Sequence, residues 1–307
     1  MIAANEIRRI AAKSGARNVK NVETDILLTF LLQLFHERGV LKHLAFKGGT
    51  MLRKMVFGPR GRLSTDLDFT VTSDLSRDDF TLVLIETLGE PYRGLTFSVG
   101  DRKDWYLAEN GCGATPLVCH AENPDGVRVK LEVSMRERPV LPVTLQPQIP
   151  HAYFSQLDFH PTDVPCLAFE EILAEKLRAA SQRSKIRDLH DLAESADRPF
   201  DRSLVRGVAV LKLWSQREAL DYIRIVERIR NHADYDIGDL TTLLRKDQRP
   251  DLSRLIERVV SGYRFLNDLT ELERLVAADI AGRRQDLASR LGVELQQREA
   301  SHSAGPG

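Results

Sequence analysis

The chain has 307 residues, enough for roughly two domains, and 42% of them are apolar, so a sizeable core can form. Lys plus Arg and Asp plus Glu both number 44, which excludes a protein that coats nucleic acid with a uniformly basic surface. Three cysteines at wide spacing fit neither a disulfide framework nor a zinc ribbon, so we expect a reducing, cytoplasmic compartment. The densest apolar run, residues 26–35, is far shorter than the ~20 residues that a membrane span needs, so we expect no membrane partner.

The N-terminal half predicts alternating helices and strands. A core helix is expected at 21–36 behind an Asn21 cap, and a short strand at 44–46 leads through Gly48 and Gly49 into a helix at 51–56. After a loop rich in Gly and Arg, residues 66–72 alternate polar and apolar as a strand does. The remaining expected elements are a helix at 76–88, capped by Ser76, and strands at 95–99, 105–108, 117–121 and 127–133.

The C-terminal half predicts helices only. A connector punctuated by prolines, residues 139–165, separates the halves. Helices are expected at roughly 169–183, 186–196, 203–231, 251–268 and 270–294. We therefore expect an α+β protein with an α/β domain at 1–150, a helical domain at 151–297 and a disordered tail at 298–307.

Asp66 and Asp68 share one face of the strand expected at 66–72. Two carboxylates at such positions repel each other by ~1 to 4 kcal/mol, and a divalent cation such as Mg²⁺ relieves this repulsion. The alternative is a solvent-facing edge strand on which the aspartates only add solubility. Taken alone, the pair does not decide between the two interpretations.

The glycine turn favours the metal site. Because Gly48 and Gly49 lack a Cβ, the backbone can approach a phosphate closely, and the Thr50 hydroxyl and N–H lie at the positive start of a helix. A Gly-Gly dipeptide is usually only a turn, and the sequence contains neither a P-loop nor a G-x-G-x-x-G fingerprint.

Four sequence blocks together resemble the AbiEii/AbiGii toxin family of nucleotidyltransferases. The blocks are Lys47-Gly48-Gly49-Thr50, Arg62-Leu63-Ser64-Thr65-Asp66-Leu67-Asp68-Phe69, Glu170-Glu171-Ile172-Leu173-Ala174-Glu175-Lys176-Leu177 and Arg187-Asp188-Leu189-His190-Asp191-Leu192. The similarity spans roughly residues 20–195. It implies a mixed-sheet nucleotidyltransferase domain like that of DNA polymerase β, followed by a helical domain that closes over the nucleotide.

The resemblance also implies roles for individual residues. Glu132, in a context similar to the family's third carboxylate, would join Asp66 and Asp68 as a ligand of Mg²⁺. Lys47, Gly48, Gly49, Thr50 and Ser64 would bind the nucleotide. Lys176 would contact the triphosphate, and Asp188 or Asp191 would organise that lysine or the nucleotide.

Each of these residues also has an ordinary structural explanation. Lys176 resembles a solvated helix lysine, Arg187 and Asp191 are an i, i+4 pair, and Asp188 favours a helix N-terminus. The basic residues Arg53, Lys54, Arg60 and Arg62, with Arg178, Arg183, Lys185 and Arg187, are candidates to rim a cleft or are ordinary surface charge.

The implied activity is transfer of a nucleoside monophosphate from an NTP to RNA, with the tRNA 3′ end as the first candidate and pyrophosphate as the other product. The implied biology is a bacterial toxin–antitoxin or phage-defence pair with a separately encoded AbiEi-type antitoxin. Two alternatives stay open, namely transfer to a small molecule, as in antibiotic-modifying relatives, and NTP-binding regulation without turnover.

Overall fold

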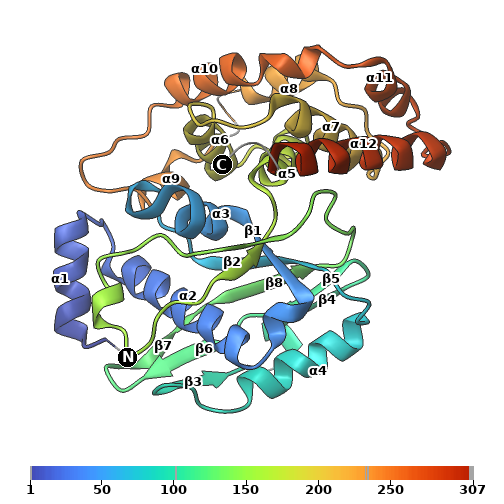
Figure 1. The fold of residues 1–307 in the computed structure, drawn as a ribbon. Helices are drawn as coiled ribbons and strands as arrows, with labels where there is room; N and C mark the ends of the chain where they lie inside the picture. Colours follow the sequence, from blue (N-terminus) through green and yellow to red (C-terminus); the bar gives the residue numbers. More distant parts are fainter. Residues whose placement is uncertain (1, 101, 232, 234, 304–307) are drawn as a thin grey trace. The chain divides into compact units, whose positions relative to one another are not determined.

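Two units divide the chain in the computed structural model, which describes residues 2–100, 102–231, 233 and 235–303, without the side chains of 302 and 303 (Figure 1). Unit 1 comprises Met1–Pro139, Val143–Cys166 and Thr242–Arg249. Unit 2 comprises Val140–Pro142, Leu167–Thr241 and Pro250–Gly307. The main change of unit thus follows Cys166 rather than the expected residue 150, and a segment from the C-terminal half returns to unit 1.

The described residues of unit 1 form two sheets and four α-helices. Its helices are α1 (Ala4–Ser14), α2 (Val19–Glu37), α3 (Gly48–Met51) and α4 (Arg77–Leu88). Its strands are β1 (Leu44–Lys47), β2 (Asp66–Val71), β3 (Leu95–Ser98), β4 (Trp105–Ala108), β5 (Gly111–Ala114), β6 (Leu117–His120), β7 (Asn123–Arg128), β8 (Lys130–Ser134), β9 (Thr144–Gln146) and β10 (Val164–Cys166).

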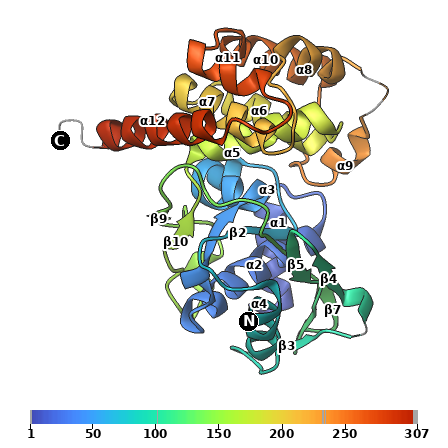
Figure 2. The ribbon, with the colours of Figure 1, turned by 90° about the vertical axis from the view of Figure 1, so that its right-hand side faces the viewer.

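The larger sheet has the order β4-β5-β8-β2-β1-β10-β9 and mixes parallel with antiparallel pairs. β2 runs parallel to β8 and β1 runs parallel to β10, whereas the other neighbours are antiparallel. Figure 2 shows β9 and β10 at one end of this sheet and β4 at the other. The sheet and the abundant helices confirm the expected α+β class with a mixed sheet.

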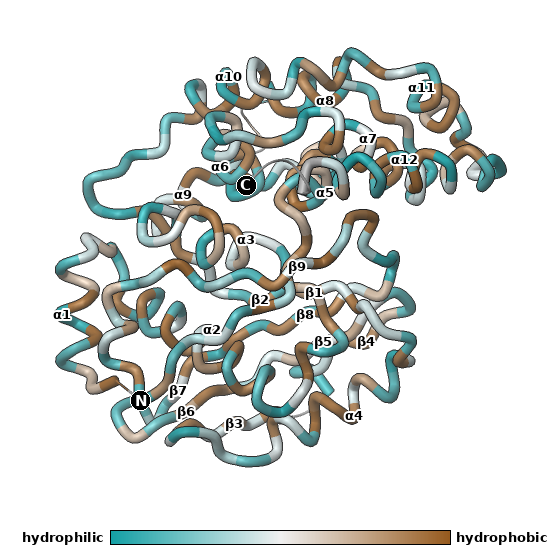
Figure 3. The backbone as a smooth tube through the Cα atoms, in the orientation of Figure 1, coloured by the Kyte–Doolittle hydropathy of each residue, from teal (hydrophilic) through white to brown (hydrophobic). Residues whose placement is uncertain are grey.

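Alternation along β2 separates a core face from a functional face. Leu67, Phe69 and Val71 are buried, and the Phe69 ring lies 6.0 Å from the ring of Phe35 on α2. The half-buried Asp66 and Asp68 therefore take the opposite face. α2 is buried along most of its length, and Figure 3 shows hydrophobic stretches among the strands of unit 1.

The start of α2 and the strand expected at 127–133 need correction, and α1 lies outside the predicted elements. α2 begins at Val19 with Asn18 as its N-cap, three residues before the predicted Asn21 cap. The strand expected at 127–133 is two strands that break at Val129, with β7 in the small β3-β6-β7 sheet and β8 in the large one. The alternation predicts extended backbone in both strands, but periodicity does not show a change of sheet.

Unit 2 is helical, as predicted. Its helices are α5 (Phe169–Gln182), α6 (Ile186–Ser195), α7 (Arg202–Trp214), α8 (Tyr222–Ile229), α9 (Ile237–Thr241), α10 (Leu252–Gly262), α11 (Glu271–Ala278) and α12 (Gln285–Ser303). The helices expected at 203–231 and 270–294 are each interrupted. α12 continues to Ser303, so the tail predicted at 298–307 is helical over its first six residues, and 304–307 lie outside the described residues.

Within the described residues, no helix combines the length and apolar character needed to cross a membrane.

Candidate active site

Three predicted site residues occupy one row across adjacent strands of unit 1. Asp68 on β2 pairs in register with Lys47 on β1 and with Glu132 on β8. Side chains at directly opposed positions of neighbouring strands point to the same face. Asp66, two residues before Asp68, lies on that face as well. The sheet therefore gathers three carboxylates and a lysine on one polar face.

The glycine turn lies directly against the Asp68 carboxylate. Gly48 has φ +79°, and a Cβ built there would lie 2.4 Å from the Asp68 Oδ2 atom. A Cβ at Gly49 would lie 2.4 Å from the Nη2 atom of Arg62. Gly48 is needed because its φ is positive and the Asp68 carboxylate occupies the space of a side chain, whereas at Gly49 the end of the Arg62 side chain would have to move. The turn thus brings backbone N–H groups and a buried arginine next to Asp68.

Thr50 and Ser64 support the turn from within. Thr50 is fully buried, and its hydroxyl donates to the backbone carbonyl of Asp66. This hydrogen bond links α3 to β2, and the nucleotide-binding role expected for Thr50 stays a prediction. Ser64 is 5% exposed, and its Oγ lies 3.4 Å from the Cβ position at Gly49.

Lys130 is a residue of this face that sequence reasoning left out of the site. It pairs in register with Asp66, and its Nζ lies 2.9 Å from Oε1 of Glu132. Partial burial opposes its charge, but the hydrogen bond to Glu132 and the charges of Asp66 and Asp68 raise the pKa of Lys130. Its i, i+2 spacing from Glu132 was the sequence signal that could have placed it here.

The donor set suits a hard divalent cation held in part by substrate. Mg²⁺ in nucleotide enzymes is commonly bound by one or two carboxylates together with phosphate oxygens and water. Asp66 and Asp68 supply such a pair beside the glycine turn. No three His, Cys, Asp or Glu side chains among the described residues already form a metal cage, and Glu132 is engaged by Lys130.

Two of the predicted rim cations form a buried network beneath the turn. Arg53 and Lys54 lie in a π-helical turn, Leu52–Phe57, and are 7% and 0% exposed. Arg53 Nε lies 3.0 Å from Oδ1 of Asp25 on α2, and Lys54 Nζ lies 3.3 Å from the same oxygen. Burial opposes charge on Asp25, yet these two cations keep its pKa far below the usual value. Arg53 and Lys54 are therefore not rim residues.

Arg53 also positions the loop that leads to the carboxylates. Its Nη1 donates to the backbone carbonyl of Gly61 at 2.6 Å. Lys54 Nζ donates to Thr29 Oγ1 at 2.9 Å and to the Tyr153 hydroxyl at 3.1 Å. The network thus fixes the ends of the loop at 58–61, which joins the glycine turn to β2.

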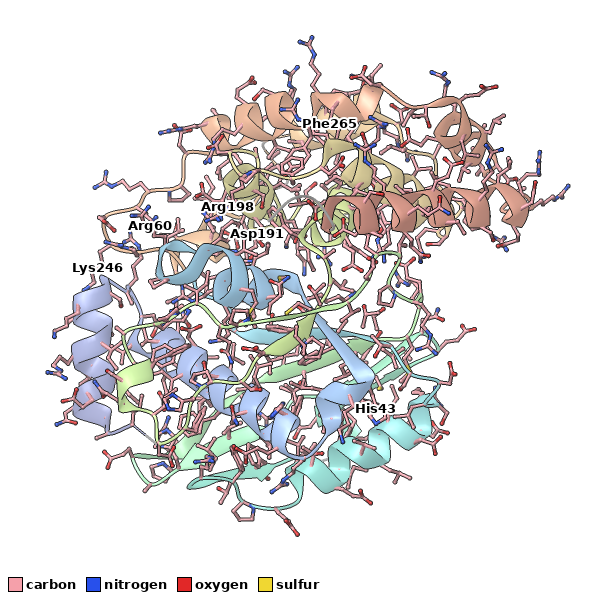
Figure 4. All side chains as sticks on the ribbon, viewed as in Figure 1. His43, Arg60, Asp191, Arg198, Lys246 and Phe265 are labelled. Atoms are coloured by element: carbon pink, nitrogen blue, oxygen red, sulfur yellow. The ribbon has the colours of Figure 1, made fainter. Side chains whose placement is uncertain are left out.

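Unit 2 brings together the other predicted residues, Lys176, Asp188 and Asp191. Lys176 Nζ lies 2.9 Å from Asp188 Oδ1 and 2.8 Å from Asp191 Oδ2, so α5 and α6 share a buried ion cluster (Asp191 is labelled in Figure 4). Arg183 contacts Asp188 Oδ2 through Nε at 3.0 Å and Nη2 at 2.9 Å. Burial opposes charge on Asp188, but Lys176 and Arg183 keep the pKa of this carboxyl below its ordinary value.

The glutamates next to Lys176 have structural partners. Glu171 accepts hydrogen bonds from the backbone N–H of Val140 and Leu141, and lies 2.7 Å from Nζ of the buried Lys212. Glu175 lies 3.6 Å from the same Lys212 nitrogen. Lys176 and Glu175 thus contact different partners on different sides of α5, as the helical step between neighbouring residues predicts.

A family model described as nucleotidyl transferase AbiEii toxin, type IV TA system, matches residues 30–278. The chain belongs to this family. AbiEii toxins are nucleotidyltransferases, so this chain is a nucleotidyltransferase toxin of a type IV toxin–antitoxin system, and the predicted family assignment is confirmed. The family also implies an NTP substrate and a cognate antitoxin.

The solved structure of MenT4 agrees with the AbiEii assignment. MenT4, a nucleotidyltransferase toxin from Mycobacterium tuberculosis, is 27% identical, with 96% of this chain and 100% of that chain covered and a TM-score of 0.80. A putative nucleotidyltransferase from Helicobacter pylori is 17% identical, with coverages of 80% and 97% and a TM-score of 0.49. JHP933 from Helicobacter pylori is 16% identical, with coverages of 84% and 95% and a TM-score of 0.43. No curated protein matches the chain.

Proposed function

We propose that this AbiEii toxin transfers a nucleoside monophosphate from an NTP to a hydroxyl at an RNA end, with the tRNA 3′ end as the first candidate. The observation that supports this proposal most strongly is the pairing of Asp68 with Lys47 and with Glu132 on the neighbouring strands. Gly48 lies directly against the Asp68 carboxylate. Carboxylates beside a glycine turn suit a triphosphate that arrives with a divalent cation. The acceptor hydroxyl loses its proton to solvent as its oxygen bonds to the α-phosphorus, the bond to the β-phosphate oxygen breaks, and pyrophosphate leaves.

Mg²⁺ would be held by Asp66 and Asp68, with Glu132 as the third ligand. When bound, it supplies charge neutralisation at the phosphates and lowers the pKa of the attacking hydroxyl. The backbone N–H groups at Gly48 and Gly49 orient the phosphates, and Arg62 adds positive charge at the same place. Lys47 would neutralise phosphate charge from β1.

Lys176 is proposed to contact the triphosphate, with Asp188 and Asp191 setting its position. Two short contacts to buried carboxylates hold its ammonium group in one place. A fixed charge costs little reorganisation when phosphate charge develops. Lys176 is only 7% exposed, so an alanine variant would also leave two carboxylates without this partner. Its test therefore needs NTP binding measured beside thermal stability.

The biological role proposed for the chain follows from the same chemistry. An RNA acceptor and an NTP donor place the toxin in the bacterial cytoplasm. Blocking the tRNA 3′ end would prevent aminoacylation and arrest growth, and a separately encoded AbiEi-type antitoxin would relieve the arrest. Such a pair would also serve in defence against phage. The likeness to MenT4, itself described as a nucleotidyltransferase toxin, supports this role.

Labelling of total RNA with each of the four α-³²P NTPs tests the proposal. We expect Mg²⁺-dependent label on RNA of tRNA size with one or more of the NTPs. Periodate oxidation of the RNA terminus should abolish this label, because it destroys the terminal hydroxyls. Label that survives periodate or falls on a small hydroxylated acceptor would overturn the tRNA acceptor. NTP binding without pyrophosphate release would instead indicate a regulator.

A further inference from the structure

Two short parts of this chain, which has no net charge, carry an excess of basic side chains. Residues 1–20 hold five Lys or Arg and one acidic residue, and residues 242–249 hold three and one. All eight cations of these two parts are exposed, namely Arg8, Arg9, Lys13, Arg17, Lys20, Arg245, Lys246 and Arg249. Only such a local excess can attract a polyanion to a protein with no net charge.

The fold of unit 1 joins these two parts into one surface. Ala16 and Arg245 form an isolated β-bridge, and the backbone N–H of Lys246 donates to the carbonyl of Gly15 at 2.7 Å. Arg17 Nη2 donates to the carbonyls of Lys246 and Gln248 at 3.2 and 2.8 Å. Figure 4 labels Lys246 beside the end of α1, and Figure 3 shows the stretch before α10 as hydrophilic.

The same segment leads from this surface to the carboxylate strand. Leu243 accepts a hydrogen bond of 2.9 Å from the backbone N–H of Leu63, three residues before Asp66. Thr242 accepts one of 3.0 Å from the Asn21 side chain at the start of α2. Residues 242–249 therefore connect the loop after α1 with the loop that enters β2. The exposed Arg60 lies on this latter loop.

The exposed side of α1 is charged rather than apolar. Ile7 and Ile10 are 3% and 6% exposed, whereas Arg8, Arg9 and Lys13 face solvent. A helix that lies in a membrane interface needs its apolar residues free to insert, and those of α1 are already used in packing. Phosphate groups spaced along a nucleic-acid backbone suit an extended set of exposed cations better.

We propose that the basic surface, defined as α1, residues 15–20 and residues 242–249, docks the phosphate backbone of the RNA acceptor. Docking there would place the RNA beside the loop that leads to Asp66. This inference rests on the proposed RNA acceptor and adds where that RNA is held. α1 and residues 15–20 precede the part of the chain matched by the family model, which starts at residue 30.

A triple variant, Lys13→Gln with Lys20→Gln and Lys246→Gln, tests the surface. These lysines are exposed, and the hydrogen bond from Lys246 to Gly15 uses the backbone, so the fold should persist. We expect tRNA to bind at least about tenfold more weakly at low salt. The slope of log Kd against log salt concentration should shrink by about three, near one for each phosphate contact removed. NTP binding should not change.

A control variant removes the same charge elsewhere in unit 1. It carries Lys42→Gln, Arg102→Gln and Lys103→Gln, all at exposed positions outside the basic surface. This control should bind and label RNA as the wild type does. The double variant Lys13→Gln with Lys20→Gln, which leaves residues 242–249 intact, should show about two thirds of the change in slope.

The outcomes separate this inference from the proposed function. RNA labelling by the wild type, with equal Kd and salt slope in the triple and control variants, overturns the docking surface but leaves the RNA acceptor standing. Absence of RNA labelling by the wild type overturns both. Wild-type binding to phosphatidylserine vesicles that the triple variant loses, with tRNA binding unchanged, would assign the surface to a membrane and overturn the proposal.

Discussion

On β8, Glu132 can pair either with the neighbouring Lys130 or with a bound Mg²⁺. In the present structure the Glu132 carboxylate contacts the Lys130 ammonium at 2.9 Å, and both pair in register with the aspartates of β2. The lysine balances three carboxylates that would otherwise repel one another. Bound Mg²⁺ would balance the negative charge of these carboxylates in place of Lys130. We therefore expect Glu132 to change partner from Lys130 to the metal.

Substitutions on β8 test this exchange. Glu132→Gln should raise the Mg²⁺ concentration needed for half-maximal activity by about 10- to 100-fold or more, because a metal ligand is lost. Lys130→Met should leave that concentration unchanged or lower it, because a competing cation is gone. Mn²⁺ binding followed by electron paramagnetic resonance reads the same effect without turnover. Equal Mn²⁺ affinity in wild type and Glu132→Gln would remove Glu132 from the ligand set.

The glycine turn, at the start of α3 directly after β1, is the element on which the site geometry depends. Gly48→Ala adds a Cβ at 2.4 Å from the Asp68 carboxylate, at a positive φ. We expect at least about 100-fold loss of transfer activity, because a displacement near 1 Å at a reacting group costs that much. Gly94→Ala is the matched control, since Gly94 has φ +77° with no atom within 4 Å. It carries the same backbone strain and should keep full activity.

If the position of Asp68 matters for catalysis, Gly48→Ala must lose more transfer activity than Gly94→Ala. Gly48→Ala with wild-type activity would show that Asp68 does not need its present position. Equal losses of activity in both variants would attribute the effect to backbone strain alone, since both glycines have nearly the same φ. Thermal unfolding should show a modest loss of stability in Gly94→Ala and at least as large a loss in Gly48→Ala, whose Cβ also displaces Asp68.

Local sequence patterns were sufficient for the elements that carry the carboxylates. Alternation in 66–72 gave β2 and its polar face, and the helix repeat in 169–183 gave α5 nearly to its last residue. Local patterns do not predict which strands pair with these elements, because pairing depends on residues that are distant in the sequence. The break at Val129 and the exclusion of Lys130 from the predicted site both follow from this limit. The π-helical turn at 52–57 also has no sequence period of its own.

At the scale of the whole molecule, stability depends on a buried histidine near the Asp25 network. His151 is 6% exposed and stacks on Tyr153 with ring centroids 5.4 Å apart. Burial lowers the pKa of His151 to about 3, assisted by the charges of Lys54 and Arg53 and opposed by Asp25. An unfolded histidine has a pKa of about 6.5. The unfolded chain therefore binds an extra proton between pH ~6.5 and ~3, so stability falls as pH falls through this window.

Removing the histidine should weaken the dependence of the free energy of unfolding on pH below pH ~6.5. His151→Phe keeps the stacked ring but cannot gain a proton, so its free energy of unfolding should fall less steeply below pH ~6.5, by up to about 1.4 kcal/mol per pH unit. Denaturant unfolding at several pH values measures the slope. His160→Gln, at an exposed position, is the control and should follow the wild type. A wild-type slope in His151→Phe would mean that other groups set the acid limit.

The division into units shows most clearly what one sequence leaves undetermined. Composition and prolines indicated an α/β half and a helical half, and both exist. The return of residues 242–249 to unit 1 depends on backbone hydrogen bonds to Gly15 and Leu63, more than 170 residues away. Burial of Arg53 and Lys54 likewise depends on Asp25 in a distant helix, whereas their charge alone suggested a surface position.

The central claim is that nucleotidyl transfer takes place at the aspartates beside the glycine turn. Asp68→Asn preserves the shape of the side chain and removes its charge, so it tests this claim most directly. We predict that pyrophosphate release from the preferred NTP, with total RNA and Mg²⁺ present, falls by about 10²–10³-fold or more in this variant. Asp74→Asn, at a fully exposed side chain, should release pyrophosphate at the wild-type rate. A wild-type rate in Asp68→Asn would contradict the account.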